Sequence, residues 1–191
     1  MPFAAFAERR KSWPSAAIVC AAGAGLAAGL FANVGRKMVV QGLSATHGSW
    51  DKGLKAEHRA VLKIFDKLEQ TDEEQEAKRL LLLAQLKHAL SKHAYEEENI
   101  VYPAMREHGQ VQEADELVHD HGYVKQYLFE LGETPSSASG WAVKLGDFRR
   151  SIEDHVRREE EELFPRLREA LGKEGNAHVT AAVNKAGFMA A

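Results

Sequence analysis

Two halves of this chain repeat one another, which restricts the fold to pairs of similar elements. The segment EHRAVLKIFDKLE, beginning at residue 57, matches DHGYVKQYLFELGE, beginning at residue 120. Further on, HAYEEENIVYPAM, from residue 93, matches HVRREEEELFPRL, from residue 155. Each matched segment begins at or next to a histidine, and a proline stands ten residues after His93 and ten after His155. A chain built this way has a pseudo-twofold axis, so equivalent residues of the two halves can meet at its centre.

The repeated segments have the periodicity of α-helices. Apolar residues recur in alternating steps of three and four over about 51–70, 72–105, 111–132 and 140–171, which places them on one helix face. Short breaks separate the segments, Thr71 and Glu74 form a capping-box pattern, and Gly172 marks a stop. We therefore predict an all-α protein, an up-down-up-down four-helix bundle at residues 48–172, with an N-terminal apolar segment.

Six polar residues fall on the stripes that should face the core: His58, His93, Glu97, His121, His155 and Glu159. A buried carboxylate without a partner costs several kcal/mol, in a domain stable by only about 5–15 kcal/mol. His93 with Glu97, and His155 with Glu159, are spaced to lie one helical turn apart. Four imidazoles and two carboxylates exceed what one tetrahedral zinc needs, so we predict two metals, each held by two histidines and bridged by the two glutamates. A nitrogen and oxygen ligand set favours iron, with manganese or zinc as alternatives.

These residues resemble the hemerythrin-type HHE cation-binding domain. The resemblance rests on His58, His121 and the two His-x-x-x-Glu motifs with their following prolines, and it covers about 50–171. It implies a non-haem pair of irons with an oxo or hydroxo bridge in a four-helix bundle. It also implies either a protein that binds or senses oxygen or iron, or, as the alternative, an oxidoreductase acting on peroxide or nitric oxide.

This sequence departs from the oxygen-carrying hemerythrins at two places. Their third helix supplies two histidines at i and i+4, whereas the neighbours of His121 here are Leu117 and Lys125. Their fourth-helix motif ends in aspartate, one residue later than Glu159. The usual arrangement of one saturated and one open iron is therefore not expected, and two histidines for each iron would leave both irons under-coordinated. The ferritin-like di-iron family is disfavoured, because its Glu-x-x-His order is the reverse of the order here.

The remaining polar residues are predicted to lie outside the site. We expect His119 on another face from His121, and His47, His88, His108 and His178 in solvent. We interpret Glu96, Glu98 and Glu160–Glu162 as a solvated charged face, with Glu96 or Glu160 able to hydrogen-bond to a ligand. Tyr95, Tyr102, Tyr123 and Tyr127 are interpreted as core aromatic residues.

Residues 15–34 carry no charge, and about 20 such residues span a bilayer as a helix. We interpret residues 1–47 as a membrane anchor with a linker; Gly23, Gly25, Ala27 and Gly29 would allow helix pairing in the membrane. A removed signal peptide, and an Ala-rich helix that packs on a partner, are the alternatives, the latter in a soluble cytoplasmic protein. Residues 173–191 are assigned to a C-terminal tail.

Charge and cysteine content exclude several other classes of function. The net charge of −3 gives no electrostatic case for a nucleic-acid partner. With Cys20 as the single cysteine, an internal disulfide and a thiolate metal site of the zinc-finger kind are excluded. The expected partner is a small diatomic or peroxide ligand.

Overall fold

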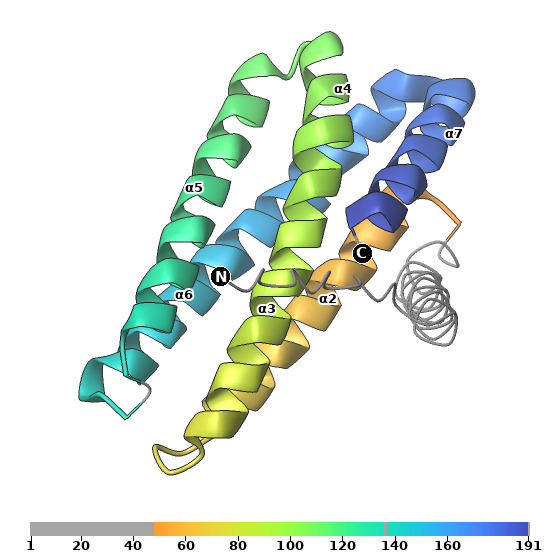
Figure 1. Ribbon diagram of the computed structural model, residues 1–191. Helices are drawn as coiled ribbons and strands as arrows, with labels where there is room; N and C mark the ends of the chain where they lie inside the picture. The colour runs from red at the N-terminus through yellow and green to blue at the C-terminus, as the bar shows by residue number, and fades with distance from the viewer. Residues whose placement is uncertain (1–47, 136, 191) are drawn as a thin grey trace, which may run out of the picture. The chain divides into compact units, whose positions relative to one another are not determined.

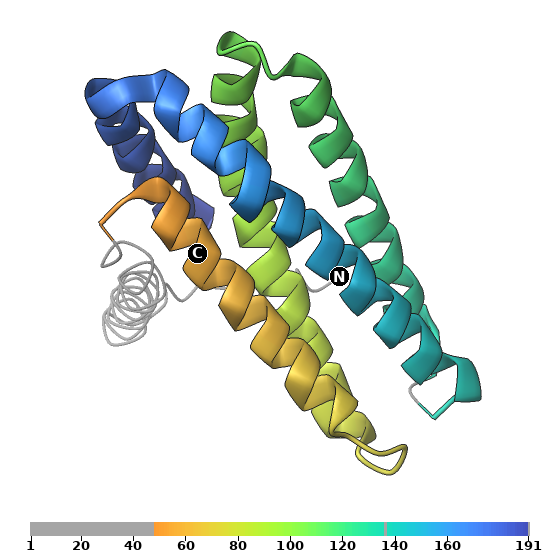
Figure 2. The ribbon, with the colours of Figure 1, turned by 180° about the vertical axis from the view of Figure 1, so that it is seen from behind.

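The computed structural model describes residues 48–135 and 137–190, and these residues are helical with no strand. The first helix of the bundle is α2 (Trp50–Glu69). The second consists of α3 (Glu76–Glu96), η1 (Glu97–Val101) and α4 (Tyr102–Glu107), and the third is α5 (Val111–Glu133). The fourth consists of α6 (Ser139–Arg158), η2 (Glu159–Leu163) and the first part of α7 (Phe164–Ala190). Figures 1 and 2 show these four helical rods side by side, joined by short connections, as predicted.

The apolar stripes predicted from sequence face the interior and form two clusters. The cluster nearer the α2–α3 connection includes Val61, Phe65, Leu86 and Phe148. The cluster nearer the α4–α5 connection includes Trp50, Leu54, Tyr102, Leu117 and Phe164. His58 lies between Leu54 of one cluster and Val61 of the other, so the polar residues of the stripes form a layer between two apolar ones.

The predicted capping box at the start of the second helix is wrong. The helix begins at Glu76, and its N-cap, Gln75, makes no side-chain cap bond. The Thr71 hydroxyl instead donates to the carbonyl of Leu68, 2.6 Å away, and accepts a hydrogen bond from Arg79 Nε. Arg79 is buried against the ring of Trp141, 4.8 Å from its centroid. Thr71 therefore closes the end of α2, and a tertiary contact has taken the place of the local cap.

Two five-residue π-turns, η1 and η2, interrupt the second and fourth helices at equivalent positions. The N–H of Tyr102 donates to the carbonyl of Glu97, and the N–H of Phe164 donates to the carbonyl of Glu159. Each turn is followed by a proline, Pro103 or Pro165. Proline has no N–H and its ring clashes with the carbonyl four residues earlier, which is a sufficient reason for the helix to widen there.

The π-turn changes which residues face the core. An α-helix turns about 100° per residue, so residue i+5 lies about 140° around the helix axis from residue i. In a π-turn the hydrogen bond joins residues i and i+5, which brings both to the same face. Tyr102 is consequently fully buried, beside the fully buried Val101. Ile100, which the regular spacing placed on the core stripe, is only partly buried.

The fourth helix breaks at Gly172, as predicted, where φ is 60° and ψ is −169°. The chain then continues as a helix to Ala190, through the residues assigned to a tail, and packs Val179 and Val183 into the core. Asn176 fastens this segment, because its amide donates to the carbonyl of Gly172 and its carbonyl accepts from Trp50 Nε1 at 2.8 Å. The second part of α7 thus covers the start of α2.

The predicted membrane segment, residues 15–34, lies outside the described residues. Within 48–135 and 137–190, none of the helices combines the length and the apolarity needed to cross a bilayer.

Candidate metal centre

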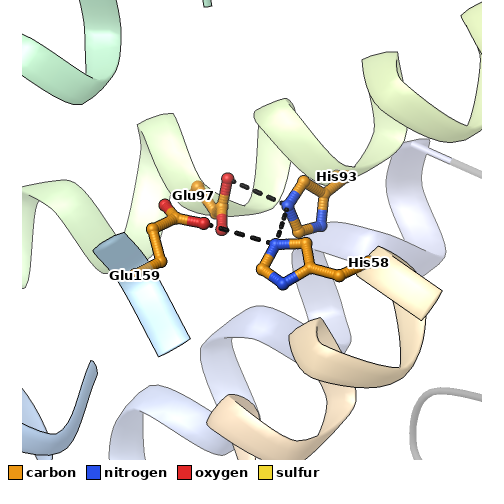
Figure 3. Close-up of side chains that lie close together, drawn as sticks. All are labelled: His58, His93, Glu97 and Glu159. Carbon is orange, nitrogen blue, oxygen red and sulfur yellow. Dashed lines mark hydrogen bonds and ion pairs between the residues drawn. The ribbon is translucent and has the colours of Figure 1, made fainter. Parts of the chain in front are cut away.

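The six predicted ligands converge in the polar layer of the bundle. The six form two groups whose ligand atoms lie within 4.8 Å of one another: His58, His93, Glu97 and Glu159 in the first, and Glu97, His121 and His155 in the second. Figure 3 shows the first group, with α2 and α3 supplying the imidazoles and the two carboxylates meeting them. Glu97 belongs to both groups, as a bridging carboxylate would. That these residues bind metal stays a prediction; the structure establishes that they meet.

Glu159 also lies between the two groups. Its Oε2 atom is 3.3 Å from His58 Nε2 and 3.5 Å from His155 Nε2. Glu97 Oε2 is likewise 3.2 Å from His93 Nε2 and 3.4 Å from His121 Nε2. Each carboxylate therefore contacts one histidine from each half of the repeat.

A carboxylate stands behind every imidazole. His58 Nδ1 lies 2.8 Å from Glu160, and His93 Nδ1 lies 3.1 Å from Glu57. His121 Nδ1 lies 3.0 Å from Glu98, and His155 Nδ1 lies 3.4 Å from Asp120. With Nδ1 donating its hydrogen outward, each Nε2 presents a lone pair to the centre, the arrangement that metal-binding histidines use.

These four outer carboxylates are themselves neutralised by cations. Glu160 lies 4.0 Å from Lys55 and Glu98 lies 3.3 Å from Lys125. The remaining pairs are Glu57 with Lys92 at 2.6 Å and Asp120 with Arg158 at 3.1 Å. The outer shell therefore orients the imidazoles without adding net negative charge to the centre.

The predicted solvated glutamate face is partly wrong. Glu96 is fully buried and pairs with Lys92 at 2.8 Å, and Glu98 contacts His121. Glu160 does contact a histidine, as allowed for, and Glu161 and Glu162 are exposed. Sequence reasoning missed Glu57, Glu98 and Asp120. The signal for them is their place in the repeat: Glu57 and Asp120 each precede a ligand histidine, and Glu98 and Glu160 each follow a ligand glutamate.

Tyr102 is a further residue whose position at the centre the sequence did not indicate. Its hydroxyl oxygen is 3.2 Å from Glu97 Oε2, 2.8 Å from Glu159 Oε1 and 3.3 Å from His121 Nε2. It was expected to be a core aromatic, and it is fully buried. The phenol oxygen nevertheless lies among the ligand atoms, because the π-turn brings Tyr102 onto the face of Glu97.

The histidines predicted to lie away from the site do so. His88, His108, His119 and His178 are exposed, and His119 contacts the hydroxyl of Tyr123. His47 lies outside the described residues.

In the absence of a metal, the buried charges of the centre favour the positive form of His93 and the negative form of Glu97. Burial opposes the charged form of His93, but the charge of Glu97 and the hydrogen bond with Glu57 outweigh it and hold the pKa of His93 well above its usual value. Burial likewise opposes ionisation of Glu97, but the charge of His93 and a hydrogen bond with His121 hold the pKa of Glu97 well below its usual value. Burial and the charge of Glu57 raise the pKa of Glu96 to about 8.

Several ligand atoms are buried with no hydrogen-bond partner: Glu97 Oε1, Glu159 Oε2 and His155 Nε2. Each such atom costs about 1–3 kcal/mol. In addition, His58 Nε2 and His93 Nε2 are 2.9 Å apart, so in the absence of a cation a proton has to lie between them. A cation bound at the Nε2 atoms would replace that proton and give the unpartnered atoms a partner, so the residues present fit a metal.

Residues 51–167, more than half of the chain, match the family model of the Hemerythrin HHE cation binding domain. The chain belongs to the hemerythrin HHE family. The resemblance drawn from the sequence is thereby confirmed, and with it the expectation of a metal-binding helical protein, iron being the metal typical of the family.

The chain is also similar to a DNA nickase of Nostoc sp. (strain PCC 7120 / SAG 25.82 / UTEX 2576), with 26% identity over 121 residues. The match covers 63% of this chain and 34% of the relative, so the chain spans about a third of the relative's length. No solved structure matches the chain significantly.

Proposed function

We propose that this hemerythrin domain holds two irons, bridged by Glu97 and Glu159, and that the centre binds or senses a small ligand such as oxygen. His58 and His93 would hold one iron, and His121 and His155 the other. Iron would supply the redox chemistry and the open coordination position for the ligand. The chain's own residues orient the imidazoles, bridge the metals and keep water out.

The observation that carries the ligand proposal is a small cavity against the histidines. Its volume is about 20 Å³, enough for one molecule of the size of water. The four ligand histidines form one wall, and aliphatic side chains, among them Val61, Leu90, Val124 and Ile152, form the rest. Such a space favours a diatomic molecule or peroxide, and it has no room for an organic substrate.

The test is metal analysis of the purified full chain, with optical spectra of the reduced, anaerobic protein before and after oxygen. Two irons per chain and a new near-ultraviolet absorption after oxygen would support the proposal. One metal per chain, or zinc alone after growth in iron-rich medium, would contradict it.

Turnover distinguishes the alternative, a di-iron oxidoreductase. The buried Tyr102 phenol beside the centre favours this alternative, because a tyrosine close to a metal pair can exchange electrons with it. Rapid, repeated consumption of peroxide or nitric oxide by the iron-loaded protein would establish the enzyme. The net charge of −3 gives no support for a nucleic-acid partner, so the activity named for the Nostoc relative is not part of this proposal.

A further inference from the structure

The two metal positions are not equivalent, although the repeat makes their histidines and glutamates equivalent. Five residues after the bridging glutamate, the first half has Tyr102 and the second half has Phe164. Both follow a π-turn and both are fully buried. Phe164 stacks on His58 with ring centroids 6.2 Å apart, whereas Tyr102 lies beside His121 with centroids 5.5 Å apart. The ring beside His58 is therefore a phenyl group, whereas the ring beside His121 carries a hydroxyl oxygen.

We propose that Tyr102 is a ligand of the metal held by His121 and His155, and that Phe164 leaves the corresponding place at the His58–His93 metal open. The inference rests on the proposed pair of irons. Metal–ligand bonds of about 2.1 Å place neighbouring ligand atoms of one metal about 3 Å apart. The Tyr102 oxygen lies 2.8–3.3 Å from a ligand atom of each of Glu159, Glu97 and His121, as a further ligand atom of that metal would.

Tyr102 also supplies what the third helix lacks. Leu117, one turn before His121, is fully buried and brings no donor atom to the centre. With the phenol oxygen, the His121–His155 metal has five protein ligands: two imidazoles, two bridging carboxylates and Tyr102. The His58–His93 metal has four, the same set without the phenol. On binding, iron takes the place of the phenolic hydrogen, which leaves as one proton.

This difference predicts where an added ligand binds. The metal with fewer protein ligands keeps the open coordination position, so the small ligand should bind to the His58–His93 metal. The cavity contacts all four ligand histidines, so a small ligand can reach this metal, and the number of protein ligands decides between the two positions.

The experiment uses the iron-loaded full chain, its Tyr102→Phe and Phe164→Tyr variants, and Tyr123→Phe as the control. Tyr123 is half-exposed and contacts His119, away from the centre. The readouts are iron content, visible absorption and resonance Raman spectra. The native protein and Tyr123→Phe should show a tyrosinate-to-iron charge-transfer band with tyrosinate ring vibrations, and Tyr102→Phe should lose both. Phe164→Tyr should gain a second tyrosinate signal and bind azide, a probe of the open position, more weakly.

Each outcome decides the question. Two irons without a tyrosinate signature in the native protein, or a signature that survives in Tyr102→Phe, would overturn the role of Tyr102 and leave the iron pair standing. If Tyr102→Phe fails to fold, the Raman spectrum of the native protein and the gain in Phe164→Tyr decide instead. A native protein without bound iron would contradict the proposed function itself.

Discussion

Each imidazole of the centre reaches inward through Nε2 because a carboxylate occupies its Nδ1 side. Glu160, Glu57, Glu98 and Asp120 act as these outer partners, and each is paired with a lysine or arginine. A histidine with a free ring would have to lose rotational freedom on binding metal. Here that cost is met during folding, when the outer carboxylates lock the rings.

The three consecutive glutamates differ in burial: Glu159 is buried, Glu160 is partly buried and Glu161 is exposed. Substituting each in turn therefore tests which of them holds the metal. Glu159→Ala should release most of the bound iron, because it removes a bridge and leaves the imidazoles facing one another. Glu97→Ala should do the same. Glu161→Ala, at an exposed position, should keep the native iron content. The measurement is iron per chain after desalting. Equal iron content in all three variants would show that the bridging residues are wrongly assigned.

Glu160→Ala should be intermediate between its two neighbours. It leaves all six ligands in place but frees the ring of His58, and losing such a partner lowers metal affinity by about 10–100-fold. Glu98→Ala should have the same effect through His121. Competition with a chelator measures the affinity, again with Glu161→Ala as reference. Native affinity in both variants would mean that the outer carboxylates do not hold the rings.

At the scale of the helices, the π-turns decide the composition of the centre. A regular helix would place Ile100 towards the core and turn Tyr102 away from Glu97. The sequence carries the cause, a proline after each glutamate run, but proline can also kink, end or begin a helix. The choice among these outcomes depends on what the widened turn can pack against, so the periodicity alone could not reveal it.

The break at Gly172 should depend on glycine. At φ 60° and ψ −169° a side chain is strained by about 1–3 kcal/mol, although a Cβ there meets no atom within 4 Å. We therefore expect Gly172→Ala to lower the free energy of unfolding by that amount. Gly122→Ala is the matched control, because it lies within α5, is equally uncrowded, and should raise stability by about 0.5–1 kcal/mol. Denaturant unfolding of the metal-free protein measures both. Similar effects of the two substitutions would contradict this account.

At the scale of the whole molecule, the centre links stability to pH in opposite ways with and without metal. Without metal, Glu96 and three histidines have pKa values raised in the folded state, so each stabilises the fold at low pH; the histidines are His58, His93 and His155. These contributions are lost as the pH rises through the folded pKa, which is about 8 for Glu96. With metal, the imidazoles must be neutral, so metal binding strengthens as the pH rises.

We expect the free energy of unfolding of the metal-free protein to fall between about pH 6 and about pH 8, by up to about 1.4 kcal/mol per pH unit for each group. The melting temperature should fall with it. The iron-loaded protein should not show this fall. Glu96→Gln removes one of these groups and should make the metal-free slope shallower. Thermal unfolding followed by circular dichroism measures all three, and parallel pH profiles with and without iron would rule out the linkage.

The predicted anchor also belongs to this scale. We expect the full chain to remain with membranes after a carbonate wash and a version without residues 1–40 to be released. The reason is the uncharged run at 15–34, whose length as a helix is about 30 Å. Release of both forms would contradict the anchor. An intact N-terminal mass would then separate a removed signal peptide from a segment that packs on a partner.

The sequence by itself determined the four-helix bundle and the convergence of the six polar residues. Those conclusions follow from local periodicity and from the cost of burying charge, and both can be read from single segments. The tertiary structure decided which neighbours complete the centre. Glu57 and Asp120 contact histidines of other helices, and Tyr102 meets Glu159 across the pseudo-twofold axis. Such contacts depend on how helices distant in sequence are rotated against one another, and a π-turn changes that rotation without altering the spacing of residues along the chain.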